Sequence, residues 1–380
     1  MRRALWAGIA GALIVAIVSS LRPTPYNNYV LFADALLHGR LWIDWPGPYI
    51  DAVAWHGHRF IINDPVPGLL LIPLVALVGT AANQTLLSVV LAGIAVGGAW
   101  RLCERFELDP RATAWLVVFF FVGTDLLWCA FLGDVWFLAQ VSATAFLVLT
   151  LLELQGKNRA WLVALWFVLA VGSRFTIVMA TPVVAYLACA GGIPRLRRIA
   201  GFGAVFGLAA ALWVGYNIAR WGVPWDSGHT IFFHEDAVGS VVGSPFGLRN
   251  LAYQFQSFFV QGVTVLPQWP WLKPEYGGLA LTWTSPALIL ALWANRPRVT
   301  VVAMWTATLL VAAPSFLYYV NGFAQFGMRH ALDFEPFLFV LMILAVRRLG
   351  GIPPLGMVLI AWSTLVGTWG VWFWRIFYRG

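Results

Sequence analysis

Charged side chains are scarce in this chain. Only 11% of the 380 residues are charged, whereas 61% are hydrophobic, and the mean hydropathy is +0.79. Soluble domains carry about 25% charged residues, so this scarcity excludes a soluble globular protein. The net charge of +8 does not indicate a nucleic-acid partner, because the basic residues stand in short clusters between apolar runs, as the loop charges that orient membrane helices do.

Cysteines and metal-binding motifs are also scarce. Cys103, Cys129 and Cys189 are isolated, and none belongs to a CxxC pair, so neither a disulfide framework nor a zinc site is predicted. No DxD, HExxH or Walker motif occurs. The pair His56 and His58 lacks a third ligand. A divalent metal is therefore not indicated, and no other cofactor is predicted.

Long apolar runs are abundant. A membrane-spanning helix needs about 20 apolar residues, and eleven runs in this sequence are candidates. They are Ala4–Leu21, Gln84–Trp100, Ala112–Phe131, Val135–Leu152, Ala160–Val171, Thr176–Cys189, Ala200–Ile218, Leu279–Ala294, Val299–Val320, Ala331–Val346 and Pro354–Trp374. The first run follows two arginines as a signal peptide would, but further hydrophobic segments follow it, and we interpret it as a crossing. The sequence predicts an all-α polytopic membrane protein with one transmembrane domain, 1–380.

Two segments need separate treatment. The run Pro67–Gly79 is short and punctuated by proline, so we expect an interfacial or re-entrant helix. Ala160–Val171 and Thr176–Cys189 are each short for a full span, and Arg174 lies between them. We keep them as a hairpin of tilted or half-length helices packed inside protein.

With those two choices, most basic residues fall on one side of the membrane. Short connections on that side hold 14 of the 24 Lys and Arg. They are Arg2, Arg3, Arg101, Arg105, Arg111, Lys157, Arg159, Arg195, Arg197, Arg198, Arg296, Arg298, Arg347 and Arg348. The positive-inside rule makes this side cytoplasmic. We expect a multi-pass protein of the cell (plasma or inner) membrane, with its N-terminus in the cytoplasm and its C-terminus outside.

The opposite side then holds two long polar segments, residues 22–83 and 219–278. Loops of this length are usually functional or disordered, and their many tryptophans argue against disorder. We therefore expect the functional site among these loops.

The first of these loops is rich in carboxylates. It contains Asp34, Asp44, Asp51 and Asp64. The pattern between Tyr29 and His38 is that of a short amphipathic helix, which places Asp34 and His38 one turn apart on the same face. Carboxylates beside cations near the membrane surface suit general-base chemistry, although any single loop carboxylate is more often merely solvated.

Basic residues at the outer ends of the predicted helices are the second group of candidates. Ionisable groups at membrane depth are costly and favour a functional interpretation, and the planar fork of arginine suits phosphate. We select Arg174, Arg329 and His330 as candidate substrate-binding residues. For Arg220 and Arg249 we expect snorkelling to lipid headgroups instead.

Two further aspartates flank the outer end of the run Ala112–Phe131. Asp134 is expected to be a loop or cap residue, whereas Asp125 must pair or face a wet cavity. Gln140 follows inside the next run, and either aspartate could line the site without taking part in the chemistry.

Four stretches make the chain resemble the GT-C glycosyltransferases, in particular the bacterial enzymes grouped with protein O-mannosyltransferases and the lipid A aminoarabinose transferase (family 39-like). They are 32–41 (FADALLHGRL) with 64–70 (DPVPGLL), 172–176 (GSRFT) with Pro182, 216–224 (YNIARWGVP), and 326–330 (FGMRH). The resemblance implies a bundle of about eleven transmembrane helices and a long first outer loop with interfacial helices. It also implies inverting transfer from a polyprenyl-phosphate-linked sugar, at a site between that loop and the membrane.

One departure from the family concerns the base. Members usually carry Asp-Glu just after the first crossing, whereas this chain has Pro25-Tyr26 there. The same alignment sets Asp44 on a second family aspartate, so Asp44, Asp34 and Asp64 are the candidate catalytic bases. Arg174, with Arg329 or His330, would stabilise the departing lipid phosphate. An ordinary carboxylate is ionised at neutral pH and needs no unusual pKa for this role.

The function expected from the sequence is therefore a membrane glycosyltransferase. It would move a sugar from a polyprenyl phosphate to a lipid, glycan or protein acceptor on the outer (periplasmic or extracellular) face, in contact with membrane lipids. A transporter or flippase of a lipid-linked sugar is the alternative, although no repeat typical of transporters is found. A non-catalytic protein of envelope assembly is the third interpretation. Convergence of the candidate aspartates and arginines on one cavity would favour the enzyme.

Overall fold

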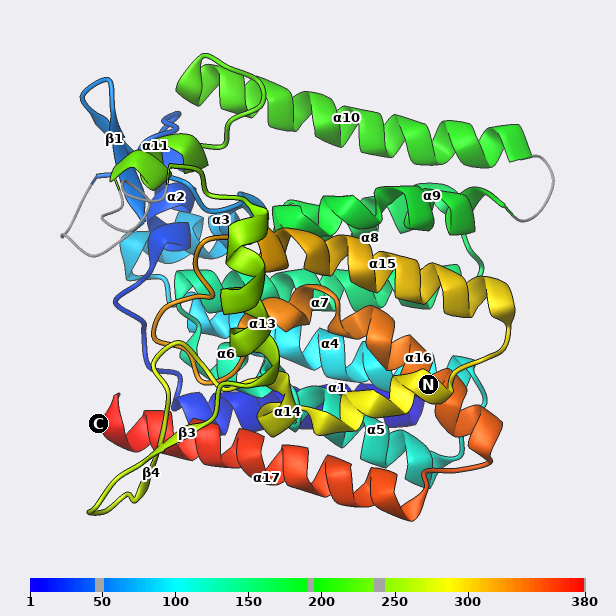
Figure 1. The fold of residues 1–380 in the computed structure, drawn as a ribbon. Helices are drawn as coiled ribbons and strands as arrows, with labels where there is room; N and C mark the ends of the chain where they lie inside the picture. The colour runs from blue at the N-terminus through cyan, green and yellow to red at the C-terminus, as the bar shows by residue number, and fades with distance from the viewer. Residues whose placement is uncertain (45–50, 191–194, 236–242, 379–380) are drawn as a thin grey trace.

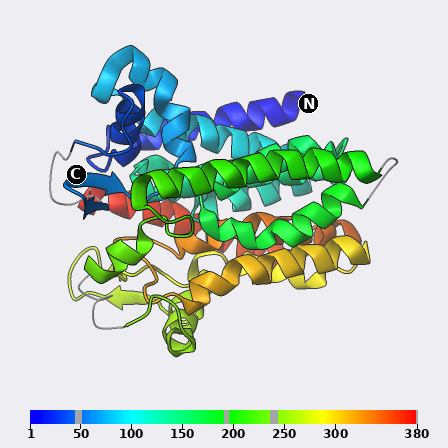
Figure 2. The same ribbon diagram turned by 90° about the horizontal axis from the view of Figure 1, so that it is seen from above.

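The computed structural model describes residues 1–44, 51–190, 195–235 and 243–378. The protein is mostly helical, and its longer helices lie side by side along one direction (Figures 1 and 2). These helical segments are α1 (Arg2–Ser19), α4 (Thr85–Arg105), α5 (Pro110–Val122), α6 (Leu126–Leu132), α7 (Val135–Leu154), α8 (Ala160–Val171), η2 (Phe175–Ala180), α9 (Thr181–Cys189), α10 (Arg195–Trp221), α14 (Leu281–Thr284), η4 (Pro286–Trp293), α15 (Arg298–Leu317), α16 (Glu335–Leu349) and α17 (Pro354–Phe377).

Six of these helices are long and apolar enough to cross a bilayer, namely α1, α4, α7, α10, α15 and α17. The pair α5 and α6, bent by 48°, counts as a seventh if it is one span. The other predicted crossings are helical but shorter or interrupted, as in α8, η2 with α9, α14 with η4, and α16. The chain is thus an all-α membrane protein in outline, and the number of eleven crossings stays a prediction.

The two long polar segments gather at one end of the bundle (Figure 1). The first contains α2 (Asn28–Leu37), β1 (Ala52–Trp55), β2 (His58–Ile61), α3 (Val66–Val78) and η1 (Gly79–Ala81). The second contains α11 (His229–Glu235), η3 (Leu248–Asn250), α13 (Leu251–Phe259), β3 (Val263–Val265) and β4 (Leu272–Pro274). We call this the loop end. Helix α1 begins at the opposite end, and α17 finishes at the loop end (Figure 1).

Three local expectations are confirmed by the backbone. Helix α2 covers the amphipathic segment around Asp34, and α3 is a 13-residue helix at the position of the run Pro67–Gly79. Helix α8 ends at Val171, and η2 begins at Phe175. The chain therefore breaks at Arg174, as the hairpin interpretation requires.

Two short β hairpins in the long loops were not predicted. In the first, β1 pairs antiparallel with β2, from Ala52 opposite Ile61 to Trp55 opposite His58. Its two turn residues, His56 and Gly57, have φ of 49° and 80°, the left-handed conformation that a tight hairpin turn requires. The second hairpin joins β3 and β4.

Small residues bring α1 and α4 together. A Cβ at Gly8 would lie 2.8 Å from the carbonyl oxygen of Gly93, and one at Gly97 would lie 3.3 Å from the Cα of Gly8. Glycines four positions apart allow this close approach between helices in lipid. Helix α7 is buried almost throughout, whereas α10 is largely exposed. The core therefore lies around α7, and α10 borders the bundle.

Candidate functional site

Two hydrogen bonds join the turn between α8 and η2 to the first long loop, one between backbone groups and one from the backbone to a side chain. Val66 donates its N–H to the carbonyl of Gly172 (2.9 Å), and Phe175 donates its N–H to Oδ2 of Asp64 (2.9 Å). A Cβ at position 172 would lie only 2.6 Å from Cγ2 of Val66, so a glycine allows this contact. These links hold the Asp64 carboxylate against the turn that carries Arg174.

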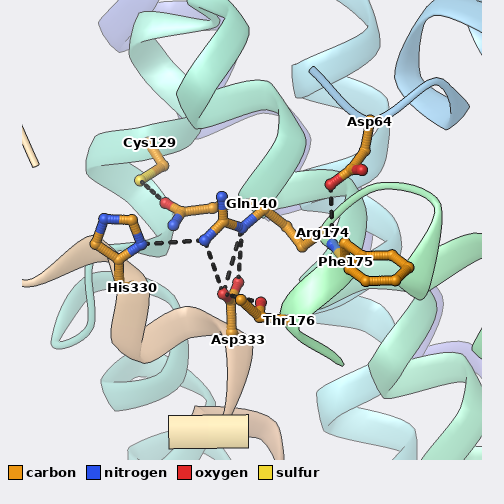
Figure 3. A network of polar contacts seen from close by, with 8 residues as sticks. All are labelled: Asp64, Cys129, Gln140, Arg174, Phe175, Thr176, His330 and Asp333. Atoms are coloured by element: carbon orange, nitrogen blue, oxygen red, sulfur yellow. Dashed lines mark hydrogen bonds and ion pairs between the residues drawn. The ribbon is translucent and has the colours of Figure 1, made fainter. Parts of the chain in front are cut away.

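The guanidinium of Arg174 is held by Asp333 (Figure 3). Its Nε donates to Oδ1 at 3.1 Å, and its Nη2 donates to Oδ2 at 2.9 Å. Asp333 is buried, at 1% side-chain exposure, and also accepts the hydroxyl of Thr176 (2.7 Å). Two parallel N–H donors to one carboxylate make a pair of fixed orientation.

The imidazole of His330 completes this arrangement. Nη2 of Arg174 lies 3.0 Å from Nδ1 of His330. Because arginine only donates, Nδ1 must accept, which leaves the imidazole neutral with its proton on Nε2. Nη1 of Arg174 makes no hydrogen bond to any residue that the structure describes, and it is not among the buried atoms. One charged donor is therefore open to a ligand.

Two more donors near this arginine lack acceptors within the described chain. Nε2 of Gln140 and Nε of Arg329 are buried and unpartnered. Oε1 of Gln140 accepts a hydrogen bond from the thiol of Cys129 (3.7 Å) (Figure 3). This bond fixes the orientation of the amide and directs its Nε2 away from Cys129. The charges of Arg174 and Arg329 both act on Cys129, which places all four residues in one neighbourhood. Buried polar groups without partners are rare, and these two are donors that an oxygen-rich anion would satisfy. Two carboxylate oxygens whose charges also act on Cys129, Oδ2 of Asp125 and Oε2 of Glu335, are likewise buried without partners among the described residues.

The Asp64 carboxylate lies on the other side of Arg174. Burial raises its pKa from 3.8 to about 6, although the hydrogen bond from Phe175 and the charge of Arg174 both oppose this shift. A carboxylate with a pKa near 6 is still mostly ionised at neutral pH, and it is a stronger base than an exposed aspartate. The structure thus adds a shifted pKa that the sequence did not predict.

Arg220 contradicts the expectation of snorkelling. It is buried at 5% exposure. Its guanidinium lies 3.7 Å from the ring centroid of Tyr216 and donates to the carbonyl of Ile61 (2.9 Å) and to Asn217 (3.1 Å). The folded first loop covers the end of α10 and removes this arginine from headgroups. The positive charge of Arg220 favours the ionised form of Asp64.

Arg249, the other arginine expected to reach headgroups, is exposed and donates to the carbonyl of Ser244 (2.7 Å).

Asp34 and Asp44 lie in a different group of charges. Both form ion pairs with Arg40. Oδ2 of Asp34 lies 3.8 Å from Nη2 of Arg40, and Oδ2 of Asp44 lies 2.8 Å from Nη1. The Asp44 side chain is 80% exposed. Asp34 also lies 3.6 Å from Nδ1 of His38, one turn along α2 as expected. Of the three candidate bases, only Asp64 is brought to Arg174.

The two aspartates beside α6 have different surroundings. Asp134 immediately precedes α7 and accepts the hydroxyl of Thr24, so the loop or cap position is confirmed. Asp125 precedes α6 and is buried, and its carboxylate is within electrostatic range of Arg329. Asp51 accepts the indole N–H of Trp136.

Asp333 is the residue of this site that the sequence analysis missed. A signal was present, because Asp333 lies inside the predicted crossing Ala331–Val346, where an acid is costly unless it is paired. No group of three or more His, Cys, Asp or Glu that could hold a metal is found among the described residues.

Comparison of the chain with family models, curated proteins and solved structures finds no match. The interpretation of the site therefore depends on its own geometry.

Proposed function

We propose that the protein is a membrane glycosyltransferase that uses a polyprenyl-phosphate-linked sugar and acts at the loop end, on the outer face of the membrane. The observation that carries the proposal is that one carboxylate, Asp64, lies on one side of Arg174, while donors that lack acceptors among the described residues lie at Arg174 and on its other side (Figure 3). These donors are Nη1 of Arg174, Nε2 of Gln140 and Nε of Arg329. A base near a charged arginine that keeps an unpaired donor suits the displacement of a phosphate by a hydroxyl.

The proposed reaction is a single displacement. The acceptor hydroxyl gives its proton to Asp64 while its oxygen forms a bond to the anomeric carbon of the sugar. The bond between that carbon and the phosphate oxygen breaks, and its electron pair leaves with the polyprenyl phosphate. Because attack and departure occur on opposite faces, the configuration inverts.

The site's donors act on the leaving group. Nη1 of Arg174 and the Nε2–H of His330 would meet the negative charge that develops on the phosphate oxygen. Asp333 and Thr176 fix the orientation of Arg174, so the donors need no rearrangement during the reaction. The apolar helices that lead to the loop end would accommodate the lipid carrier.

The test is reconstitution of the full chain in liposomes with a panel of polyprenyl-phosphate sugars and of lipid, glycan and peptide acceptors, followed by measurement of released polyprenyl phosphate. We expect release from at least one donor, and a loss of roughly 100-fold or more in Asp64→Asn. Asp44→Asn is the matched control, since it makes the same change in the same loop on an exposed side chain. Absence of release from every donor, or full turnover of Asp64→Asn, would contradict the proposal.

A further inference from the structure

A cleft lies near the proposed reaction site. It occurs between the β1–β2 hairpin and the end of α10, and its volume is about 360 Å³. Its lining includes Trp42, Trp55, His56, His58, Arg220 and Trp221. Arg220 therefore belongs to the wall of this cleft and also acts on Asp64.

The walls of the cleft are built from flat rings. Trp42 stacks on His58 with ring centroids 4.2 Å apart, and Trp55 stacks on His56 at 4.7 Å. Trp55 also meets Trp221 edge to face at 6.3 Å. These contacts fix the ring orientations, so the cleft is formed before a ligand arrives.

The polar groups of the cleft are donors rather than acids. None of the described residues that line it is acidic, whereas Arg220 and two histidines are present. The indole Nε1 of Trp221 is buried and has no hydrogen-bond partner within the described chain. Fixed rings together with the exposed imidazoles of His56 and His58 suit a ligand that has apolar C–H faces and many oxygen atoms.

We infer that this cleft binds a saccharide unit of the acceptor, which makes the acceptor of the proposed transfer a glycan. The inference rests on the proposed function. Sugar rings combine apolar C–H faces with hydroxyl oxygens, and a volume of about 360 Å³ lies at the small end of ligand pockets. Nη1 of Arg220 binds the carbonyl of Ile61, three residues before Asp64. The unit in the cleft thus lies next to the reacting unit, not at the reacting carbon.

The test measures saccharide binding without any donor. Saturation-transfer NMR would be recorded on the full chain in lipid nanodiscs, with mannobiose and cellobiose as neutral probes and methyl glucuronide as an acidic one. We expect transfer to at least one probe, with affinity reduced roughly tenfold in Trp42→Ala and in Trp55→Ala. Trp55→Phe keeps a ring and should retain most of the affinity. Trp225→Ala, an exposed tryptophan outside the cleft, should bind as the wild type does.

The outcomes separate this inference from the proposed function. Absence of transfer to every probe, or equal affinity of the wild type, Trp42→Ala and Trp55→Ala, overturns the inference. If polyprenyl phosphate is nevertheless released in an Asp64-dependent way, the proposed function stands alone. If saccharide binding depends on Trp55 but the protein releases no polyprenyl phosphate, the saccharide cleft stands and the proposed transferase function falls. Thermal unfolding of each variant checks that it is folded, and Trp42→Ala carries the test if Trp55→Ala is not.

Discussion

Two arginines at the loop end each lie between two aspartates, yet their surroundings differ. Arg40 contacts Asp34 and Asp44, all within eleven positions of sequence, and Asp44 is 80% exposed. Arg174 contacts Asp333, 159 positions away and 1% exposed, and lies beside Asp64. Exposed ion pairs contribute little because water screens them, whereas a charge held in a buried pair is oriented and costly to disturb. The comparison favours Arg174 as the arginine that does chemistry.

Replacing Arg174 and Arg40 one at a time should produce the largest difference in turnover between the two groups. In Arg174→Gln we expect turnover to fall roughly 100- to 1,000-fold, because the leaving phosphate loses its charged donor. Arg40→Gln should remain within about twofold of wild type. Release of polyprenyl phosphate is the measurement, and equal effects of the two changes would abolish the distinction between the groups.

Removal of one carboxylate from each group tests stability. Asp333→Ala leaves a largely buried guanidinium without its partner, and should lower the free energy of unfolding by about 3 kcal/mol. Asp44→Ala should change it by less than about 0.5 kcal/mol. Equilibrium unfolding in mixed detergent micelles measures both, and a loss below about 1 kcal/mol in Asp333→Ala would show that the buried pair is weakly held.

The pH dependence of turnover distinguishes Asp64 from an exposed aspartate. Burial raises the pKa of Asp64 to about 6, and only the ionised carboxylate accepts a proton. Turnover should be flat above about pH 7 and fall roughly tenfold per pH unit below about pH 6. A profile measured with saturating donor that falls only near pH 4 would indicate an exposed base in place of Asp64.

The smallest expected effect concerns the link between the first loop and the Arg174 turn. A Cβ in Gly172→Ala would press on Val66 and shift Asp64, lowering turnover about tenfold while every charged group remains. Gly207→Ala in α10 is the control, because a Cβ there meets nothing within 4 Å. Unchanged turnover in Gly172→Ala would mean that α3 adjusts without moving the carboxylate.

Local sequence patterns were sufficient for much of the fold. Apolar runs predicted the helical segments, the short run Pro67–Gly79 appears as the short helix α3, and the charge at position 174 predicted the break before η2. The contact between Asp34 and His38 followed from helical spacing. Each of these depends on residues close in sequence, whose geometry the helix period dictates. The hairpin β1–β2 was missed because a short strand pair has no long apolar pattern.

The sequence by itself determined a helical membrane protein with its polar segments in two long loops, and it selected three aspartates without ranking them. Only the tertiary structure separated their surroundings. It brought Asp64 to Arg174 through Phe175, paired Arg174 with Asp333, and buried Arg220 under Ile61. These contacts join positions 111 to 159 residues apart. The periodicity of one segment carries no information on which distant segment it meets, because the packing of the whole bundle determines those neighbours.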